Sequence, residues 1–346
     1  MSTKAVLITG ANGEIGHGLV TRLTEQDPDI KIVAIDVHPL SKTLKTLCHE
    51  VIVGDIMDAS LLDRLAAFYD FGTIYHLAAI LSTKAEREPV LGHRVNVDGT
   101  LGLLELAARQ ARATGENVKF LFPSSIAAYG LPDVPTKMKA GKVKETEWLD
   151  ARTMYGINKK YCEDLGRYYN WYYRQIDPQP TAAHVDFRAI RFPGLISAVT
   201  LPTGGTSDYG PEMMHFAAQG KVYDCFVPES ATLPFMVMPD AINALLKLEA
   251  TPAKQLTQVV YNIGAFSVSA KQFYDVIKKA FPAAQVNFKP DSLRQKIVDS
   301  WPADVDDSLA QKEWGWKAEY DFKRSFEEYL IPAVKQRYEK NNLFPR

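Results

Sequence analysis

The first sixteen residues constrain the fold more than any other part of the chain. After Lys4, residues 5–9 are apolar or β-branched, and residues 4–9 contain no Gly or Pro, which predicts a buried strand. Gly10, Gly13 and Gly16 follow, and a helical pattern of Leu and Val continues over 19–23. Backbone N–H groups and the positive end of a helix dipole converge at such a turn, so it can bind a pyrophosphate. The alternative is a glycine-rich turn that binds nothing.

Composition excludes several functional classes. The chain has 346 residues and a net charge of −1, which suggests neither nucleic acid nor a membrane surface as a partner. No apolar run approaches the roughly 20 residues of a transmembrane helix, and we expect no signal peptide, because strand residues begin almost at once. Cys48, Cys162 and Cys225 are odd in number and widely spaced. We therefore expect no disulfide framework, no metal site and a cytoplasmic protein.

Alternating strand and helix patterns predict the fold class. The expected strands span residues 4–9, 31–36, 51–53, 73–77, 118–122 and 185–191, with helices at 61–68, 87–113 and 153–173. This rhythm predicts an α/β fold with a Rossmann-like, doubly wound parallel sheet.

The second half of the chain predicts a division into two parts. We expect an NAD-binding domain over residues 1–192, to which 238–263 return. A smaller C-terminal substrate-binding lobe is expected to comprise residues 193–237 and 264–346. Residues 131–150 are rich in Pro and Lys and indicate a surface excursion.

An acidic residue ends the second expected strand. Asp36 stands about twenty positions after the glycines, where a carboxylate accepts the ribose 2′-hydroxyl of NAD. The next three residues, 37–39, include no Arg that could accept the 2′-phosphate of NADP, so NAD is the expected cofactor. The alternative for Asp36 is a simple turn residue at a strand end.

A phenol and an ammonium share one face of the helix expected over 153–173. Tyr155 and Lys159 are four residues apart. We expect Lys159 to lower the pKa of Tyr155, so that the phenol exchanges a hydroxyl proton while a hydride moves to or from nicotinamide. Tyr274 and Lys278 repeat this spacing, so spacing alone is weak evidence.

The context separates the two Tyr-Lys pairs. Ser124 and Ser125 follow the expected strand over 118–122, and doubly wound sheets bind ligands outside the carboxyl ends of their strands. Ser125 can therefore hydrogen-bond the reacting oxygen, and we interpret Tyr155 as the catalytic tyrosine. Asn96 can support Lys159 through a water, or have only a structural role.

These motifs resemble a known superfamily. The glycine turn, Asp36, residues 124–130, Tyr155 with Lys159, and residues 191–194 resemble the extended short-chain dehydrogenases/reductases, the NAD-dependent epimerase/dehydratase family. The resemblance covers nearly the whole chain. It implies that Ser125, Tyr155 and Lys159 are catalytic. With the strand ends, it implies a cofactor site formed by Gly10, Asn12, Gly13, Glu14, Ile15, Gly16, Asp36, Asp55, Ile56, Leu77, Ala78, Ala79, Asn96, Ser124, Tyr155, Lys159, Phe192 and Pro193.

The second half distinguishes branches of this superfamily. Dehydratases carry an Asp-Glu pair where this chain has Ile126 and Ala127, and nucleotide-sugar epimerases place an Arg where it has Trp301. The branch that resembles this chain is the short-chain type of threonine dehydrogenase; the similar stretches are residues 193–197, 203–209, 233–240 and 300–316.

The resemblance implies a reaction and an assembly. The implied reaction is oxidation of the 3-hydroxyl of L-threonine to 2-amino-3-ketobutyrate, with Tyr155 as general base. The implied assembly is a homodimer packed through the helices over 87–113 and 153–173. Two alternatives remain: an epimerase or dehydrogenase of a nucleotide sugar or sugar acid, and an NAD-sensing module without activity.

The expected substrate is a small polar hydroxy compound. Its candidate contacts are Ser82, Ser125, Tyr155, Gly194, Thr206 and Ser207. The chain departs from the family pattern at Ala85 and Thr203, where Gly is usual, and at Ser207, where Thr is usual. These departures surround the expected substrate site.

Overall fold

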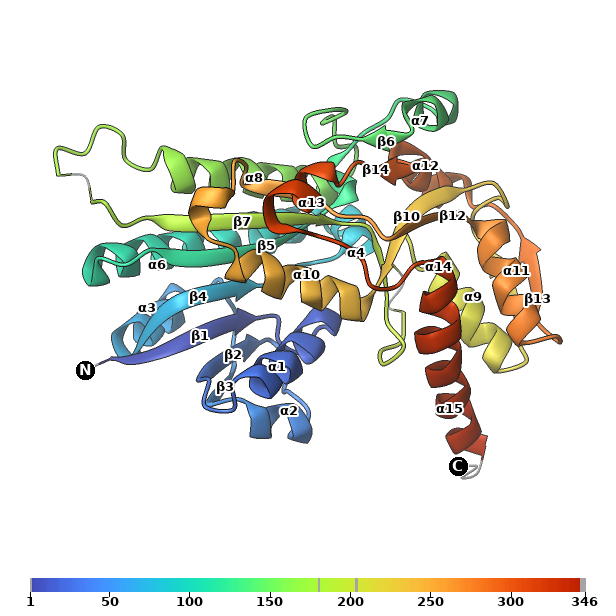
Figure 1. Cartoon of the computed structure of the whole chain (residues 1–346), viewed down its shortest axis with the longest axis horizontal. Coiled ribbons are helices and arrows are strands. Elements are labelled where there is room, and N and C mark those ends of the chain that lie inside the picture. Colours follow the sequence, from blue (N-terminus) through green and yellow to red (C-terminus); the bar gives the residue numbers. More distant parts are fainter. Residues whose placement is uncertain (1, 180, 203–204, 343–346) are drawn as a thin grey trace.

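A seven-stranded parallel sheet forms the centre of the protein (Figure 1). The computed structural model describes residues 2–179, 181–202 and 205–342. The strands lie in the order β11-β7-β5-β4-β1-β2-β3. Their bounds are Thr3–Thr9 (β1), Ile32–Asp36 (β2), Glu50–Val53 (β3), Tyr69–His76 (β4), Val118–Ser125 (β5), Val185–Phe192 (β7) and Val260–Asn262 (β11). The predicted Rossmann-like α/β fold is confirmed.

The strand order reverses between β1 and β4. The chain runs outward through β2 and β3, and then returns to place β4 on the other side of β1. The last residues of these two strands, Thr9 and His76, are partners in the sheet register. Open α/β sheets bind ligands outside the carboxyl ends of the strands at such a reversal.

Helices cover both faces of the sheet, as a parallel sheet requires. Leu7 packs with α3, α6 and α8 on one face, whereas Ile8 packs with α1, α2, α10 and α13 on the other. The helix bounds are Glu14–Gln26 (α1), Lys42–Leu47 (α2), Ala59–Phe68 (α3), Gly99–Thr114 (α6), Met154–Trp171 (α8), Met238–Ala250 (α10) and Ser308–Trp314 (α13).

The long helix expected over 87–113 is divided into pieces. It comprises α5 (Pro89–His93), the π-helical segment η1 (Arg94–Asp98) and α6, and it is preceded by α4 (Ser82–Arg87). The π-helical segment ends at Asp98, directly before Gly99. A π-helical turn inside an α-helix is rare and often lies at a functional site.

A smaller lobe adjoins the sheet, on the right of Figure 1. Its core contains Tyr209, Phe235 and Phe273, which pack edge to face. The strands are β8 (Gly194–Ile196), β9 (Val222–Cys225), β10 (Thr232–Val237), β12 (Phe266–Ser269) and β13 (Gln285–Phe288). The helical segments are α9 (Tyr209–Ala218), α11 (Ala270–Ala280), α12 (Ser292–Ser300), α14 (Phe322–Arg324), η4 (Ser325–Leu330) and α15 (Ile331–Asn342).

The excursion at 131–150 has structure that its composition did not predict. It contains α7 (Val134–Ala140) and β6 (Lys142–Val143), and β6 pairs with β14 (Asp304–Val305). Lys137 is only 2% exposed, and its Nζ donates to the carbonyl of Val298 at 2.9 Å. The part of the chain that the structure describes also forms two 3₁₀ turns, η2 (Ile126–Ala128) and η3 (Ala253–Gln255).

Candidate active site

The glycine turn leaves no space for side chains. Gly10 has a φ of +67°, and a Cβ there would lie 2.6 Å from the backbone nitrogen of Ala78. A Cβ on Gly16 would lie 2.5 Å from the carbonyl oxygen of Ala11. Gly13 precedes α1 and provides no side-chain cap, so N–H groups of the first turn remain available to an anion.

Asp36 is held at the end of β2 by two backbone groups. The N–H of Asn12 donates to Oδ2 and the N–H of His38 donates to Oδ1, both at 2.9 Å. Each oxygen keeps a lone pair for a ribose hydroxyl. The uncapped helix end and this fixed carboxylate fit the pyrophosphate and the adenosine ribose of NAD.

Other predicted cofactor residues lie around this turn. The Leu77 N–H donates to the Thr9 carbonyl at 3.0 Å, which fixes the start of the segment containing Ala78 and Ala79. Asp55 is exposed. The Ile56 side chain packs closely on Gly99, because a Cβ on Gly99 would lie 2.7 Å from Ile56 Cδ1. Phe192 and Pro193 are buried where β7 ends.

Glu14 contacts the lobe. Its Oε1 accepts a hydrogen bond from Thr200 Oγ1 at 2.7 Å. Burial raises the pKa of Glu14, and the nearby Asp208 carboxylate acts in the same direction. Sequence reasoning did not identify Thr200, because no local pattern relates residues that are 186 positions apart.

The start of α8 brings Tyr155 to Ser125. The Thr153 hydroxyl caps the helix by accepting from the Gly156 N–H at 3.0 Å. A Cβ on Gly156 would lie 2.0 Å from the Ala127 carbonyl oxygen, so the helix lies directly on η2. In this position Tyr155 hydrogen-bonds Ser125.

Lys159 is buried one turn further along α8. It is 4% exposed, and its Nζ donates to the Pro123 carbonyl at 2.6 Å. The Nζ lies 4.4 Å from the centroid of the Phe122 ring and 5.6 Å from that of Tyr155. Burial lowers the pKa of Lys159 to about 8, although Cys162 and Glu163 oppose the shift.

One electrostatic expectation is corrected by this arrangement. The pKa of Tyr155 is raised, because burial of the phenol outweighs its hydrogen bond from Ser125. The expectation from the sequence that Lys159 lowers the pKa of Tyr155 is therefore wrong. The ammonium is instead bonded to Pro123, and both groups are withdrawn from water.

Two predicted cofactor side chains have other partners. Ser124 Oγ donates to Glu163 Oε1 at 2.6 Å, and Glu163 forms a buried ion pair with Arg191, also at 2.6 Å. Asn96 accepts from the Ile80 N–H at 2.7 Å and donates to the Ile80 carbonyl at 3.0 Å. Glu163 was not identified from the sequence, although its position one helical turn after Lys159 was a usable signal.

The predicted substrate residues come together in pairs. Ser82 Oγ and Thr206 Oγ1 lie 3.0 Å apart, and both residues are buried. A Cβ on Gly194 would lie 3.2 Å from the Cβ of Ser207, so these two residues are also neighbours. The predicted departure at Thr203 falls outside the described residues.

A family model matches most of the chain. Residues 6–264 match the model of the NAD dependent epimerase/dehydratase family. The chain belongs to this family.

Similar proteins share one printed activity. A mitochondrial L-threonine 3-dehydrogenase of Bos taurus is 32% identical over 316 residues, which cover 91% of this chain and 79% of that protein. The solved L-threonine dehydrogenase of Clostridium difficile is 32% identical with a TM-score of 0.84, covering 98% of this chain and 99% of that one. A monomeric L-threonine 3-dehydrogenase from a metagenome is 34% identical with a TM-score of 0.82, covering 97% and 99%. This family member is therefore an NAD-dependent dehydrogenase.

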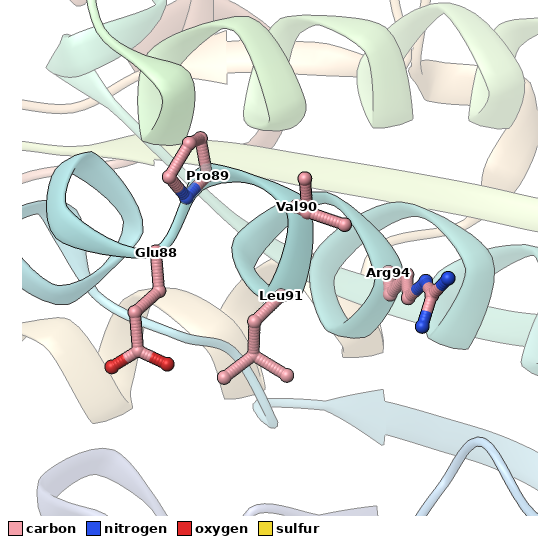
Figure 2. A pocket seen from close by; sticks show the side chains of 5 residues that line it. All are labelled: Glu88, Pro89, Val90, Leu91 and Arg94. Carbon is pink, nitrogen blue, oxygen red and sulfur yellow. The ribbon is translucent and has the colours of Figure 1, made fainter.

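An apolar hollow lies outside the catalytic group. It has a volume of about 410 Å³ and is lined by Glu88, Pro89, Val90, Leu91 and Arg94. Figure 2 shows Glu88 and Leu91 projecting from one side of this helical segment and Pro89 from the other. The lining includes none of Ser125, Tyr155 and Lys159.

The described residues contain no cluster of His, Cys, Asp or Glu that could hold a metal ion. Within the same ranges, no helix is both long enough and apolar enough to cross a membrane.

Proposed function

We propose that this dehydrogenase oxidises the 3-hydroxyl of L-threonine to 2-amino-3-ketobutyrate. The observation that carries the proposal is the contact of Tyr155 with Ser125 at the end of β5, combined with the hydroxyl pair of Ser82 and Thr206. The first pair suits a reacting hydroxyl, and the second suits the polar groups of a small substrate. The related dehydrogenases named above support the choice of L-threonine.

Each catalytic side chain has one proposed task. Ser125 orients the substrate hydroxyl, and the Tyr155 phenolate accepts its proton. NAD, when bound, accepts the hydride from C3. Lys159 holds a hydroxyl of the nicotinamide ribose, so it must stay protonated.

The proposed substrate lobe comprises residues 193–237 and 264–346, set against an NAD-binding domain of residues 1–192 with 238–263. Gly194, Thr206 and Ser207 are its proposed contacts with the substrate. Trp301, which the resemblance places at the position of the epimerase arginine, is 5% exposed and packs in the lobe core. This position therefore supplies no cation for a diphosphate, which supports a small substrate.

A substrate panel tests the proposal. Purified protein with NAD and L-threonine is expected to produce NADH absorbance, and NADP is expected to be a poor substitute. Turnover of a sugar acid but not of threonine would contradict the proposal. Thermal stabilisation by a UDP-sugar would favour the nucleotide-sugar alternative.

We also propose a homodimer formed through α5, α6 and α8. Helix α8 contacts both α5 and α6, and the three helices and the residue after α8 leave large apolar side chains in water. The exposed set is Val90, Leu91, Leu101, Ile157, Tyr161, Tyr168, Trp171 and Tyr172. Exposed apolar patches of this kind mark protein interfaces.

Sedimentation tests the dimer. We expect the wild type to sediment as a dimer and Tyr161→Glu as a monomer. Ile176→Glu is the matched control, because Ile176 is 98% exposed and lies outside this face. A monomeric wild type, as in the monomeric relative, would contradict the dimer.

We propose a cytoplasmic location. All three cysteines are free thiols, and Cys162 and Cys225 are buried, which suits a reducing compartment. Cell fractionation checks this, and recovery with mitochondria, as in the name of the bovine relative, would contradict it.

A further inference from the structure

A continuous chain of hydrogen bonds crosses the sheet where the strand order reverses. Thr9 Oγ1 lies 2.8 Å from His76 Nδ1, and His76 Nε2 lies 2.8 Å from Thr100 Oγ1. Thr9, His76 and Thr100 are each at most 1% exposed. The chain thus joins the ends of β1 and β4 to the first turn of α6, beneath the glycine turn.

The direction of each hydrogen bond in this chain is fixed by its ends. Thr100 Oγ1 donates its one hydrogen to the Asn96 carbonyl at 2.6 Å, so it must accept from His76 Nε2. At the other end Thr9 Oγ1 accepts from the Ala78 N–H at 3.3 Å and is free to donate to His76 Nδ1. His76 therefore has its hydrogen on Nε2 and an acceptor at Nδ1.

A charged imidazole does not fit this chain of hydrogen bonds. With both nitrogens protonated, His76 would donate to both hydroxyls, and the Thr9 hydrogen would lose its acceptor. The charged group facing His76 is Lys159, and its other ring neighbours are Phe120 and Phe122. Burial and the Lys159 charge lower the pKa of His76 to about 3, which keeps the ring neutral.

At its Thr9 end, the hydrogen-bond chain fixes the backbone beside the glycine turn. Thr9 holds the Ala78 N–H, and this nitrogen lies only 2.6 Å from the position that a Cβ on Gly10 would occupy. The backbone at Ala78 and the glycine turn therefore keep a fixed separation. NAD binding depends on the shape of this turn.

At its Thr100 end, the hydrogen-bond chain is linked to α8, the helix that carries Lys159. The Asn96 carbonyl that receives the Thr100 hydrogen also accepts from Cys162 Sγ at 3.2 Å. Cys162 lies on α8, three residues after Lys159. The same residue, Asn96, fixes the Ile80 backbone through its side chain.

We propose that His76 is a positioning residue with two separable tasks. Through Thr9 it sets the shape of the NAD-binding turn, and through Thr100 it sets the placement of α8 and its catalytic lysine. The first task is measured as NAD binding, which follows from membership of the NAD-dependent family. The second is measured as turnover and rests on the proposed function.

Two half-replacements test this division. His76→Asn places an acceptor near the Nδ1 position and keeps the Thr9 end, whereas His76→Gln reaches the Nε2 position and keeps the donor to Thr100. We expect His76→Asn to bind NAD nearly as the wild type does and to lose turnover. We expect His76→Gln to bind NAD roughly tenfold more weakly, which is the effect of losing one or two hydrogen bonds. His76→Phe is expected to lose both.

Calorimetry with NAD and steady-state turnover with L-threonine provide the two measurements. His215→Gln is the control, because His215 is also buried but lies on α9 in the lobe. It is expected to change stability without changing NAD affinity. If the wild type does not oxidise threonine, the proposed function fails, while the NAD measurement still decides the first task.

Equal losses in the Asn and Gln variants, or no loss in either, would overturn the proposal, because a merely structural histidine gives no crossed pattern. If the variants do not fold, ¹⁵N spectra of histidine-labelled wild type test the proposal by reporting the protonation state and the tautomer of His76. We expect His76 to stay neutral with its hydrogen on Nε2 down to about pH 5. A cationic ring at pH 6, or a hydrogen on Nδ1, would overturn the proposal.

Discussion

Helices α8 and α11 carry the same Tyr-x-x-x-Lys spacing in different surroundings. In α8, Lys159 is buried behind the carboxyl end of β5 and Tyr155 bonds Ser125. In α11, Lys278 is exposed, and both its Nζ and the Tyr274 hydroxyl point to the carbonyl of Ala284, at 2.8 and 3.5 Å. The first pair faces a cofactor site, whereas the second pair ties the end of its helix to the following loop.

The difference shows what converts a spacing into chemistry. Four-residue spacing places both groups on one helix face, and this holds for both helices. Of the two helices, only α8 lies beside a strand end that supplies a hydroxyl, at a place from which water is partly excluded. The reactive pair is thus defined by the neighbours of its helix.

The most severe test of this contrast removes each phenol. Tyr155→Phe is expected to lower turnover about a thousandfold, within the range for loss of general acid–base catalysis. Tyr274→Phe is expected to leave turnover unchanged. Steady-state NADH production measures both variants, and a comparable loss for Tyr274→Phe would refute the contrast.

Replacing each lysine separates activity from stability. Lys159→Met is expected to lower turnover about a hundredfold, because the nicotinamide ribose loses the ammonium that holds it in place. The same change is expected to raise the free energy of unfolding by roughly 3 kcal/mol below pH 8, since burial holds the folded pKa at about 8, below the usual 10.5. Because the unfolded chain binds the additional proton between these pH values, the gain should disappear as pH rises from about 8 to 10.5.

Urea titrations at pH 7 and pH 10 measure this gain. Lys278→Met is the control, and we expect it to lose the bond to Ala284 without gaining stability or losing turnover. A Lys159→Met protein that is less stable than the wild type at pH 7 would contradict the assigned burial penalty.

The two neighbouring serines sharpen the contrast further. Ser125→Ala is expected to lower turnover roughly tenfold, as for one hydrogen bond to a reacting group. Ser124→Ala removes the bond to Glu163 and is expected to reduce stability more than turnover. Kinetics and thermal unfolding of both variants decide, and the reverse pattern would exchange the roles of the two serines.

The smallest expected effects concern the helix starts. Glu86 accepts from the Met154 N–H at the start of α8, and Ser269 caps α11 by accepting from the Gln272 N–H at 3.2 Å. Glu86→Ala and Ser269→Ala are each expected to cost about 1 kcal/mol. Only Glu86→Ala should also reduce turnover by a few-fold. Equal kinetics for the two variants would show that α8 needs no support from Glu86.

Prediction from sequence succeeded where the signal was local. The opening strand and glycine turn, Asp36 at the end of β2 and the buried parallel strands all follow from short patterns, because hydrophobic period and turn chemistry act over a few residues. The excursion at 131–150 was less predictable. Its strand β6 pairs with β14, about 160 positions away, and no local pattern encodes such a partner.

The candidate site shows the same limit. The spacing of Tyr155 and Lys159 was readable, but the raised pKa of Tyr155 was not, because burial depends on what packs around the helix. Ser124 and Asn96 were placed in the cofactor site, whereas their side chains bond Glu163 and Ile80. Strand alternation predicts which face a residue occupies, but not which partner it meets there.

The sequence by itself determined an NAD-binding Rossmann-like sheet and the order of its parts. Glycine spacing and alternation of apolar residues leave few other ways to bury the chain. Only the tertiary structure decided which Tyr-Lys pair meets a serine, that Thr200 reaches Glu14, and that His76 joins β1 to α6. These contacts bring together residues that are distant in the chain, and they exist only once the packing of the whole molecule fixes their distances.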